Sequence, residues 1–276
     1  MSFNRSNGRG LSDLRPVKLN YDVYGYADAS LLLELGNTKV MVSVSLQQSV
    51  PQFLKGQRVG WLSAEYAMLP CATQQRTQRE SSGAQRNARS VEISRLIGRC
   101  LRTVVDLNQI GERSIIVDCD VLQADGGTRV ACITASSLAL ELAIHRWVSA
   151  NIFEEDVFKE SIAAISVGVV GEKEAVDLDF NEDSSADADF NFVMTGSGNL
   201  VEIQGTCEKK TINASQFDVL KNMATTAIQQ LIVECKKTIP PVKFVQSTVA
   251  QKPYSNNGYA QKGGMFSLGS RISKTS

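Results

Sequence analysis

Histidine is almost missing from this chain, which has His145 alone among its 276 residues. A Ser-His-Asp or Cys-His catalyst needs a histidine beside its nucleophile, so both kinds of enzyme are improbable. His145 lies within LALELAIHRWV, where we expect it on a helix surface or at an interface.

Closely paired cysteines are missing too. The six cysteines are far apart and form no C-x-x-C pair: Cys71, Cys100, Cys119, Cys132, Cys207 and Cys235. This spacing argues against a zinc site and a disulfide framework, and it favours the reducing cytoplasm. The polar N-terminus, MSFNRSNGRGLSDLR, has no apolar run after its charges, and no stretch approaches the length of a membrane span. We therefore expect a soluble, cytoplasmic protein that binds no membrane.

Acidic residues are absent from residue 236 to the end, where seven residues are basic. The net charge of the whole chain is zero, but charge is segregated along it. Nine basic and three acidic residues lie between Lys55 and Arg102, whereas eight acidic residues and one lysine lie between Glu172 and Asp189. A basic surface, an acidic pocket and a basic tail indicate an anionic polymer handled beside a carboxylate site.

Strand patterns followed by a helix pattern occur twice along the chain. The first half predicts strands at 30–36, 37–47 and 114–122 and helices at 91–107 and 132–148; the second predicts strands at 162–170, 175–180, 189–194 and 199–205 and a helix at 215–237. Ser215 and Asp218 predict the capped start of the last helix, and Pro240-Pro241 its end. Residues 1–240 are therefore predicted to form a single α+β domain with two similar halves. Residues 241–276, rich in Gly, Ser and Asn, are predicted to be a disordered basic tail, which either contacts RNA weakly or solubilises the protein.

The segment DGGTR, residues 125–129, carries the features of an anion-binding loop. Its glycines let the backbone approach an anion, the following helix points its N-terminal amides there, and Arg129 adds a charged fork. A short Gly-rich loop is also a common simple turn. The nucleotide-binding patterns G-x-x-x-x-G-K-[ST] and G-x-G-x-x-G do not fit this segment.

Arginine is concentrated before and within the helix predicted at 91–107. Eight arginines lie between Arg58 and Arg102, among them Arg76, Arg79, Arg86, Arg89, Arg95 and Arg99. Arg95, Arg99 and Arg102 are spaced by four and three residues, which predicts one helix face. Such a stripe is either a solvated face or a phosphate-binding surface, and the preference for arginine over lysine favours bidentate phosphate recognition.

The stretch from Asp177 to Asp189 has six carboxylates in thirteen positions. Alternation predicts two strands joined by a polar turn, with Asp177 and Asp179 on one face of the first and Asp187 and Asp189 on one face of the second. Carboxylates this close raise one another's pKa values unless a cation intervenes. One could hold a divalent metal while another acts as a general acid, or the segment could be an acidic hairpin tip in water.

Taken together, these stretches resemble the ribonuclease PH family, bacterial phosphate-dependent 3′ exoribonucleases that trim tRNA precursors. The similar strings follow family order and spacing across about residues 1–235, at 5–17, 36–45, 51–70, 89–107, 118–129, 165–170, 178–196 and 201–208. The resemblance implies a duplicated β-α-β-α unit like domain 2 of ribosomal protein S5, in a homohexamer built as a trimer of dimers.

The resemblance also implies roles for individual residues. Inorganic phosphate, the co-substrate, is expected at Arg89, Gly127, Thr128 and Arg129. Asp183 and Asp189 are expected to support catalysis and to hold Mg²⁺, with Asp189 as the general acid. RNA is expected to contact Arg76, Arg79, Arg86, Arg95 and Arg99.

The chain departs from the family pattern at several positions. Val130 replaces the usual hydroxyl residue after the GTR arginine, and a lost hydrogen bond to a charged group, worth about 1.5–3 kcal/mol, predicts weaker phosphate binding. Basic or histidine side chains are replaced at Cys71, Gln74, Gly83 and Gln85. Arg86 offsets part of that loss.

The leading hypothesis is a phosphorolytic exoribonuclease that trims the 3′ extensions of tRNA precursors and other structured RNA. The alternative is a catalytically weakened, RNA-binding ring subunit of the exosome type. A metal-binding protein unrelated to RNA would leave the arginine-rich helix unexplained.

Overall fold

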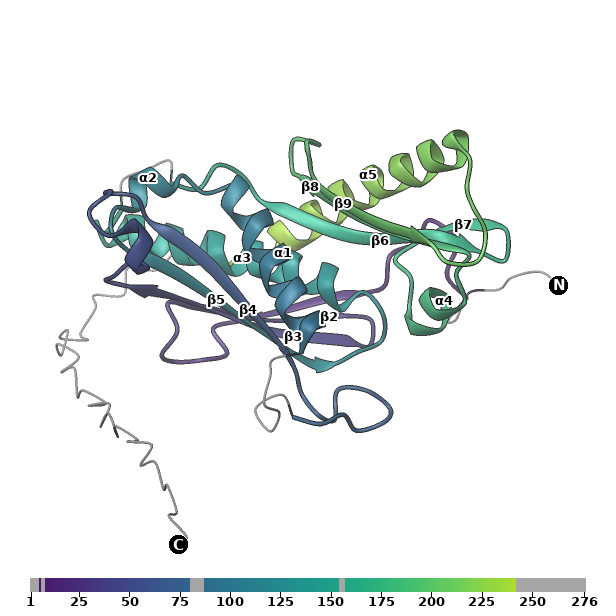
Figure 1. The fold of residues 1–276 in the computed structure, drawn as a ribbon, viewed down its shortest axis with the longest axis horizontal. Coiled ribbons are helices and arrows are strands. Elements are labelled where there is room, and N and C mark those ends of the chain that lie inside the picture. The colour runs from purple at the N-terminus through teal and green to yellow at the C-terminus, as the bar shows by residue number, and fades with distance from the viewer. Residues whose placement is uncertain (1–4, 6–7, 80–86, 154–156, 242–276) are drawn as a thin grey trace, which may run out of the picture. The chain divides into compact units, whose positions relative to one another are not determined.

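The computed structural model describes residues 5, 8–79, 87–153 and 157–241. Its strands form two sheets, one from each half of the chain (Figure 1). The first sheet has the order β1 (Val17–Tyr21), β2 (Ala29–Leu35), β3 (Thr38–Gln47), β5 (Ser114–Gln123) and β4 (Trp61–Met68). The second has the order β7 (Lys173–Val176), β6 (Ile162–Val170), β8 (Ala188–Thr195) and β9 (Leu200–Cys207). Strand neighbours are antiparallel except β4 and β5, which are parallel and connected through two helices.

The helices fill the space beside and between the sheets. They are α1 (Ala88–Thr103), α2 (Leu107–Ile110), α3 (Thr128–Ser149), α4 (Phe180–Ser185) and α5 (Ala214–Lys236), with a short 3-10 turn at Gln52–Leu54. Helix α3 packs against β2 and β3 of the first sheet and β6 of the second. It is apolar around most of its circumference and buried along most of its length, as a helix shared by two layers must be. The mixed α+β fold with two similar halves is thus confirmed.

Local sequence patterns explain most of these elements. Gly36, with φ of 56°, and Asn37 form the two-residue turn that joins β2 to β3 in antiparallel register. Helix α1 buries an apolar side at helical spacing, namely Ile93, Leu96, Ile97, Cys100 and Leu101. The all-buried pattern of β6 reflects cover on both faces.

Several helix boundaries differ from the prediction, and helix α1 begins at Ala88, three residues early. Helix α1 ends at Thr103, and α3 begins at Thr128 inside the DGGTR segment. The start of α5 is capped by Asn213 and Gln216 rather than by Ser215 and Asp218, because the Asn213 side chain accepts from the Gln216 amide while Gln216 accepts in return. This helix ends at Lys236, before the proline pair.

The acidic segment does not form the predicted hairpin, and this part of the prediction was wrong. Strand β7 ends at Val176, and Asp177 adopts a left-handed φ of 56°, which breaks the strand. Asp179 then caps α4, and its side chain accepts hydrogen bonds from the amides of Asn181 and Glu182. A capping box therefore competed successfully with strand alternation in this sequence.

Some predictions fall on residues outside the described ranges. These include Arg86, Gly83, Gln85 and the tail from residue 242 onward. Within the described part of the chain, no helix is long and apolar enough to cross a membrane. All six cysteines are free thiols.

Candidate active site

The glycine loop before α3 touches the helix that carries Asp183. Gly126 and Gly127 both have left-handed φ values, 75° and 65°. Gly127 is the N-cap of α3 and has no side chain to cap the helix, so the first-turn amides remain available to an anion. A Cβ on Gly126 would lie 2.5 Å from the backbone carbon of Asp179. The loop and the start of α4 are therefore in direct backbone contact.

Arg129 and Thr128 are held by α1, β4 and β9. The Arg129 Nη1 donates to Gln204 Oε1 at 2.8 Å and lies 3.5 Å from Glu92 Oε1. The buried Thr128 hydroxyl lies 3.2 Å from the Tyr66 hydroxyl. The side chain of Arg129 remains partly exposed, so it can still bind an anion in front of the loop.

Val130 is fully buried in the core, although it directly follows this arginine. Its side chain therefore has no access to an anion on the open side of the loop. This geometry removes the reason to expect weaker phosphate binding from the valine.

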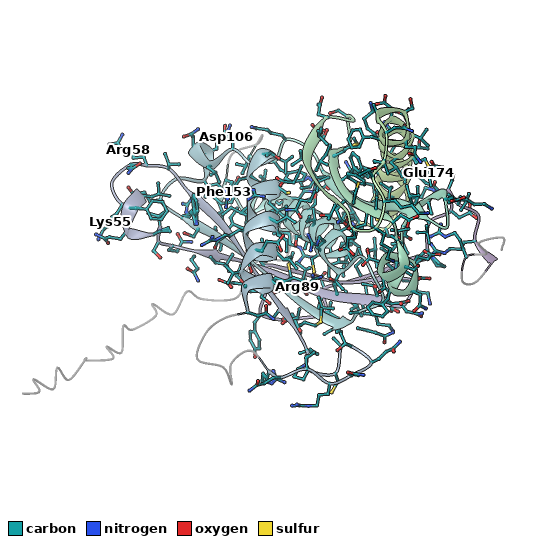
Figure 2. All side chains as sticks on the ribbon, turned by 45° about the vertical axis from the view of Figure 1, so that its right-hand side comes forward. Lys55, Arg58, Arg89, Asp106, Phe153 and Glu174 are labelled. Carbon is teal, nitrogen blue, oxygen red and sulfur yellow. The ribbon has the colours of Figure 1, made fainter. Side chains whose placement is uncertain are left out.

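Arg89 lies exposed at the N-terminal end of α1, as Figure 2 shows. The N-cap side chain of Asn87 accepts from the Arg89 amide at 2.9 Å, which fixes the first turn. The charge of Arg89 acts on Asp183 and on Tyr66. Two predicted phosphate-binding arginines, on different helices, thus influence the same carboxylate.

Asp183 and Asp189 come from α4 and β8 and lie within electrostatic range of each other. Loss of hydration raises the pKa of Asp183, while Arg129, Arg89 and Arg15 oppose the rise. Asp183 is open to solvent on one side, but the surrounding protein still displaces part of its hydration shell. Loss of hydration also raises the pKa of Asp189, and the charges of Asp183 and Glu208 raise it further.

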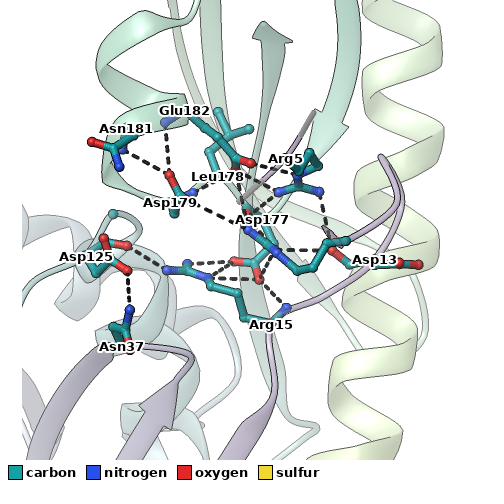
Figure 3. A network of polar contacts seen from close by, with 12 residues as sticks. Arg5, Asp13, Arg15, Asn37, Asp125, Asp177, Leu178, Asp179, Asn181 and Glu182 are labelled. Atoms are coloured by element: carbon teal, nitrogen blue, oxygen red, sulfur yellow. Dashed lines mark hydrogen bonds and ion pairs between the residues drawn. The ribbon is translucent and has the colours of Figure 1, made fainter. Parts of the chain in front are cut away.

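The other four carboxylates of the acidic segment are engaged elsewhere, which Figure 3 shows for three of them. Asp177 is fully buried against Arg15, with 2.7 Å between Oδ1 and Nη2. The Glu182 carboxylate accepts hydrogen bonds from Nε and Nη2 of Arg5, both at 2.8 Å. Asp179 caps α4, and Asp187 lies 3.3 Å from the ammonium group of Lys210. Asp183 and Asp189 make no ion pair among the described residues, so they remain available for chemistry.

This carboxylate pair fits a magnesium ion that completes its coordination with water and substrate. Magnesium is commonly held by one or two carboxylates together with substrate phosphates. Within the described ranges, no group of three or more His, Cys, Asp or Glu residues could enclose a metal. The raised pKa values of Asp183 and Asp189 show two carboxylates whose charge a cation would stabilise.

The predicted RNA-binding arginines are divided between two places. Arg76 and Arg79 are exposed in the segment that follows β4. Arg95 and Arg99 line a shallow pocket of about 420 Å³ between α1 and β9, together with Ala88, Val91, Glu92 and Gln204. Glu92 and Gln204 are also the partners of Arg129, so this pocket adjoins the predicted phosphate site.

The stripe of three arginines on α1 is not uniform. Arg99 pairs with Glu202 at 2.9 Å and stays about half exposed. Arg102 instead stacks over the ring of Trp61, 4.9 Å from its centroid, and donates to the Leu62 carbonyl. Arg102 is therefore a packing residue rather than part of an open surface.

Several residues of the site were missed by the sequence reasoning. Glu208 follows β9 and acts on both site carboxylates, and Tyr66 and Gln204 hold the DGGTR loop in place. Arg5, Arg9 and Arg15 bind the carboxylates around α4 from more than 160 residues away. Their signal in the sequence was the placement of three arginines in a short N-terminal stretch, within the family-like string at 5–17.

Comparison with known families agrees with this geometry. The chain matches the model of the 3′ exoribonuclease family, domain 1, over residues 13–144, and that of domain 2 over residues 160–226. The chain belongs to the ribonuclease PH family. It is thereby placed among the phosphate-dependent exoribonucleases, which are enzymes of the nucleotidyltransferase type.

Relatives in this family are similar over most of their length. The chain is 46% identical to ribonuclease PH of Bacillus subtilis (strain 168) over 236 residues, which are 85% of this chain and 96% of the relative. It is also 46% identical to ribonuclease PH of Neisseria meningitidis (serogroup C) over 224 residues, 81% of this chain and 93% of the relative.

Solved structures of distant ribonuclease PH-like proteins share the fold. Rice (Oryza sativa) Rrp46 superposes with a TM-score of 0.69 at 15% identity, over 86% of this chain and 100% of the other. A subunit of the Archaeoglobus fulgidus exosome, solved with RNA bound to the active site, gives a TM-score of 0.69 at 22% identity, over 84% and 92%.

Proposed function

We propose that this protein trims the 3′ extensions of tRNA precursors and other structured RNA by phosphorolysis, in the cytoplasm. Inorganic phosphate attacks the terminal phosphodiester and releases a nucleoside diphosphate, leaving an RNA shorter by one nucleotide. One observation carries the proposal: the anion-binding loop at Gly126–Arg129 touches α4, and Arg129 acts electrostatically on both Asp183 and Asp189.

The reaction brings two anions together, so positive charge is its main requirement. The amides of Gly127 and Thr128, with the guanidinium groups of Arg129 and Arg89, would bind the attacking phosphate. Asp183, with Asp189 beside it, would hold Mg²⁺, which supplies further positive charge when bound. Exposed Arg76, Arg79, Arg95 and Arg99 would bind the RNA backbone, together with Arg86.

Asp189 is suited to protonate the departing 3′ oxygen. A general acid must hold a proton near the working pH, and burial together with two neighbouring carboxylates raises the pKa of Asp189. Asp183 has a different environment, because three arginines favour its ionised form. This difference supports Asp189 as the general acid and Asp183 as the metal ligand.

We propose a homohexamer, a trimer of dimers, as the working assembly. One structural neighbour is described as an archaeal exosome core, which at 21% identity supports the fold alone. Native mass spectrometry tests the assembly, since a mass other than six chains would contradict it.

The function is tested with purified protein, a 3′-extended tRNA and Mg²⁺, with and without phosphate. Nucleoside diphosphates that form only with phosphate support phosphorolysis. Monophosphates would indicate hydrolysis. RNA binding without nucleotide release would instead favour the weakened ring subunit.

A further inference from the structure

Arg15, in the segment that leads into β1, contacts both sides of the candidate active site (Figure 3). Its Nη2 donates to Asp177 Oδ1 at 2.7 Å, and its Nε lies 3.1 Å from both oxygens of that carboxylate. Its Nη1 donates to the backbone carbonyl of Asp125 at 2.7 Å. Asp177 lies just before α4, and Asp125 opens the DGGTR loop. One side chain therefore joins the phosphate-binding loop to the segment that carries Asp183.

Both joined segments are also held from their other sides. The Thr38 hydroxyl donates to the Gly126 carbonyl at 2.7 Å and accepts from the Asp125 amide at 3.0 Å. The Arg5 guanidinium forms a bidentate pair with the Glu182 carboxylate and donates to the Asp177 carbonyl at 2.9 Å. Beside the backbone contact at Gly126, Arg15 is therefore a side-chain bridge between two well-fixed segments.

We propose that Arg15 is a positioning residue that sets the separation between the phosphate-binding loop and Asp183. The inference rests on the proposed function, because the two segments carry the nucleophile and the metal ligand of that reaction. Arg15 is about 95% buried, and Asp177 is fully buried, so the bridge excludes water and is held in one geometry.

Arginine is required here by the geometry of the bridge. Its planar fork bonds a carboxylate with two nitrogens while the third reaches a carbonyl in another direction. A lysine at this position would keep the charge beside Asp177, but its single nitrogen could not hold both segments. The charge of Arg15 also acts on Asp183 and favours its ionised form, a smaller contribution than those of Arg129 and Arg89.

Two variants separate positioning from simple folding. Arg15→Lys keeps the charge and removes the fork. The double variant Arg15→Gln with Asp177→Asn removes both buried charges together, and asparagine tolerates the left-handed φ at 177. Arg9, which also lies 3.5 Å from Asp177, keeps its ion pair with Glu182 at 3.4 Å, so no buried charge is left unpaired.

Arg146→Lys is the matched control. Arg146 binds the two oxygens of Asp22 at 2.8 and 2.7 Å and donates to the Asp28 carbonyl at 2.9 Å, the same combination of fork and carbonyl on the surface. It lies on the C-terminal part of α3, away from the loop at its N-terminus.

The experiment measures kcat, the KM values for phosphate and RNA, the phosphate affinity by calorimetry with Mg²⁺, and the unfolding midpoint. We expect both Arg15 variants to be folded. Their kcat should be lowered by about 100-fold, the effect of misplacing a reacting group by about 1 Å. Their phosphate binding should be weaker, and their KM for RNA should be unchanged. Arg146→Lys should match the wild type.

Arg15 variants with the kcat and phosphate affinity of Arg146→Lys would overturn the positioning role. A wild-type protein that releases no diphosphates would contradict the proposed function instead. In that case the calorimetric comparison still decides the inference, since equal phosphate affinity in all three variants and the wild type would refute it.

Discussion

At the scale of single residues, Asp183 and Asp189 differ in the charges that surround them. Both pKa values are raised first by loss of hydration. At Asp183, Arg129, Arg89 and Arg15 oppose the rise and Glu208 adds to it. At Asp189, the charges of Asp183 and Glu208 reinforce the rise, and Arg129 is the one arginine that opposes it. A pair of carboxylates with such different surroundings can divide the roles of metal ligand and general acid between them.

Glu208 gives this division a pH signature. If Asp183 must be ionised, activity is lost as the pH falls through its raised pKa. If Asp189 must be protonated, activity is lost as the pH rises through its own. Glu208→Gln removes a charge that raises both pKa values, so both limbs of the kcat–pH profile should move to lower pH.

The profile is compared with that of Asp218→Asn, which removes an exposed carboxylate paired with Lys221 on α5. Limbs that stay in place in Glu208→Gln, or that move equally in both variants, would count against the assignment.

Replacing Asp189 with asparagine should abolish nucleotide release while leaving RNA binding intact. The loss of a general acid lowers kcat by about 10²- to 10⁴-fold. Asp187→Asn is the matched control, because it changes a neighbouring carboxylate that pairs with Lys210. Equal effects of the two substitutions on kcat, or lost RNA binding in Asp189→Asn, would remove the assigned role.

Arg129→Ala should raise the phosphate concentration needed for half-maximal activity by about tenfold or more, the equivalent of one charged hydrogen bond. Its RNA affinity should change less, because Arg95 and Arg99 remain. Arg146→Ala, on the far part of the same helix, serves as the comparison. An unchanged phosphate dependence in Arg129→Ala would contradict phosphate binding at this residue.

At the scale of elements, the contact between the glycine loop and α4 has no space for a side chain. Gly126→Ala places a Cβ 2.5 Å from the Asp179 backbone at φ of 75°, so we expect a loss of more than about 2 kcal/mol in unfolding free energy and of phosphorolysis. Gly56→Ala meets the same left-handed strain at φ of 85° with nothing within 4 Å. It should lower stability by about 1–2 kcal/mol and leave kcat unchanged. Equal losses from both substitutions, measured by urea unfolding, would refute the contact.

The acidic segment shows what sequence patterns could not resolve. Alternation in DLDFNEDSSADADF predicted two strands, but the capping box of Asp179 and Glu182 formed a short helix instead. The outcome depended on Arg5 and Arg15, which neutralise Glu182 and Asp177 from the distant N-terminal segment. Such long-range neutralisation has no periodicity, so no local window of sequence contains it.

At the scale of the whole molecule, hydrophobic periodicity predicted the long helices and most strands of both sheets, which bury regular apolar patterns. It missed β1 and β4 of the first sheet and the short helix α4. Sheet order and the contact between the two halves were not predicted either, because α3 packs against strands that are distant from it in sequence. Asp183 and Asp189 were predicted to be catalytic through family resemblance. The structure adds a physical reason for that prediction, because each of the other four carboxylates either caps α4 or forms an ion pair.

The central claim is that one site combines a phosphate-binding loop with a carboxylate pair to cleave RNA by phosphorolysis. The most direct measurement uses a 3′-labelled tRNA precursor with Mg²⁺ and a titration of inorganic phosphate, followed by chromatography of the released nucleotides. The account predicts nucleoside diphosphates in amounts that rise with phosphate and saturate, and none without it. Nucleoside monophosphates, or release that is independent of phosphate, would contradict it.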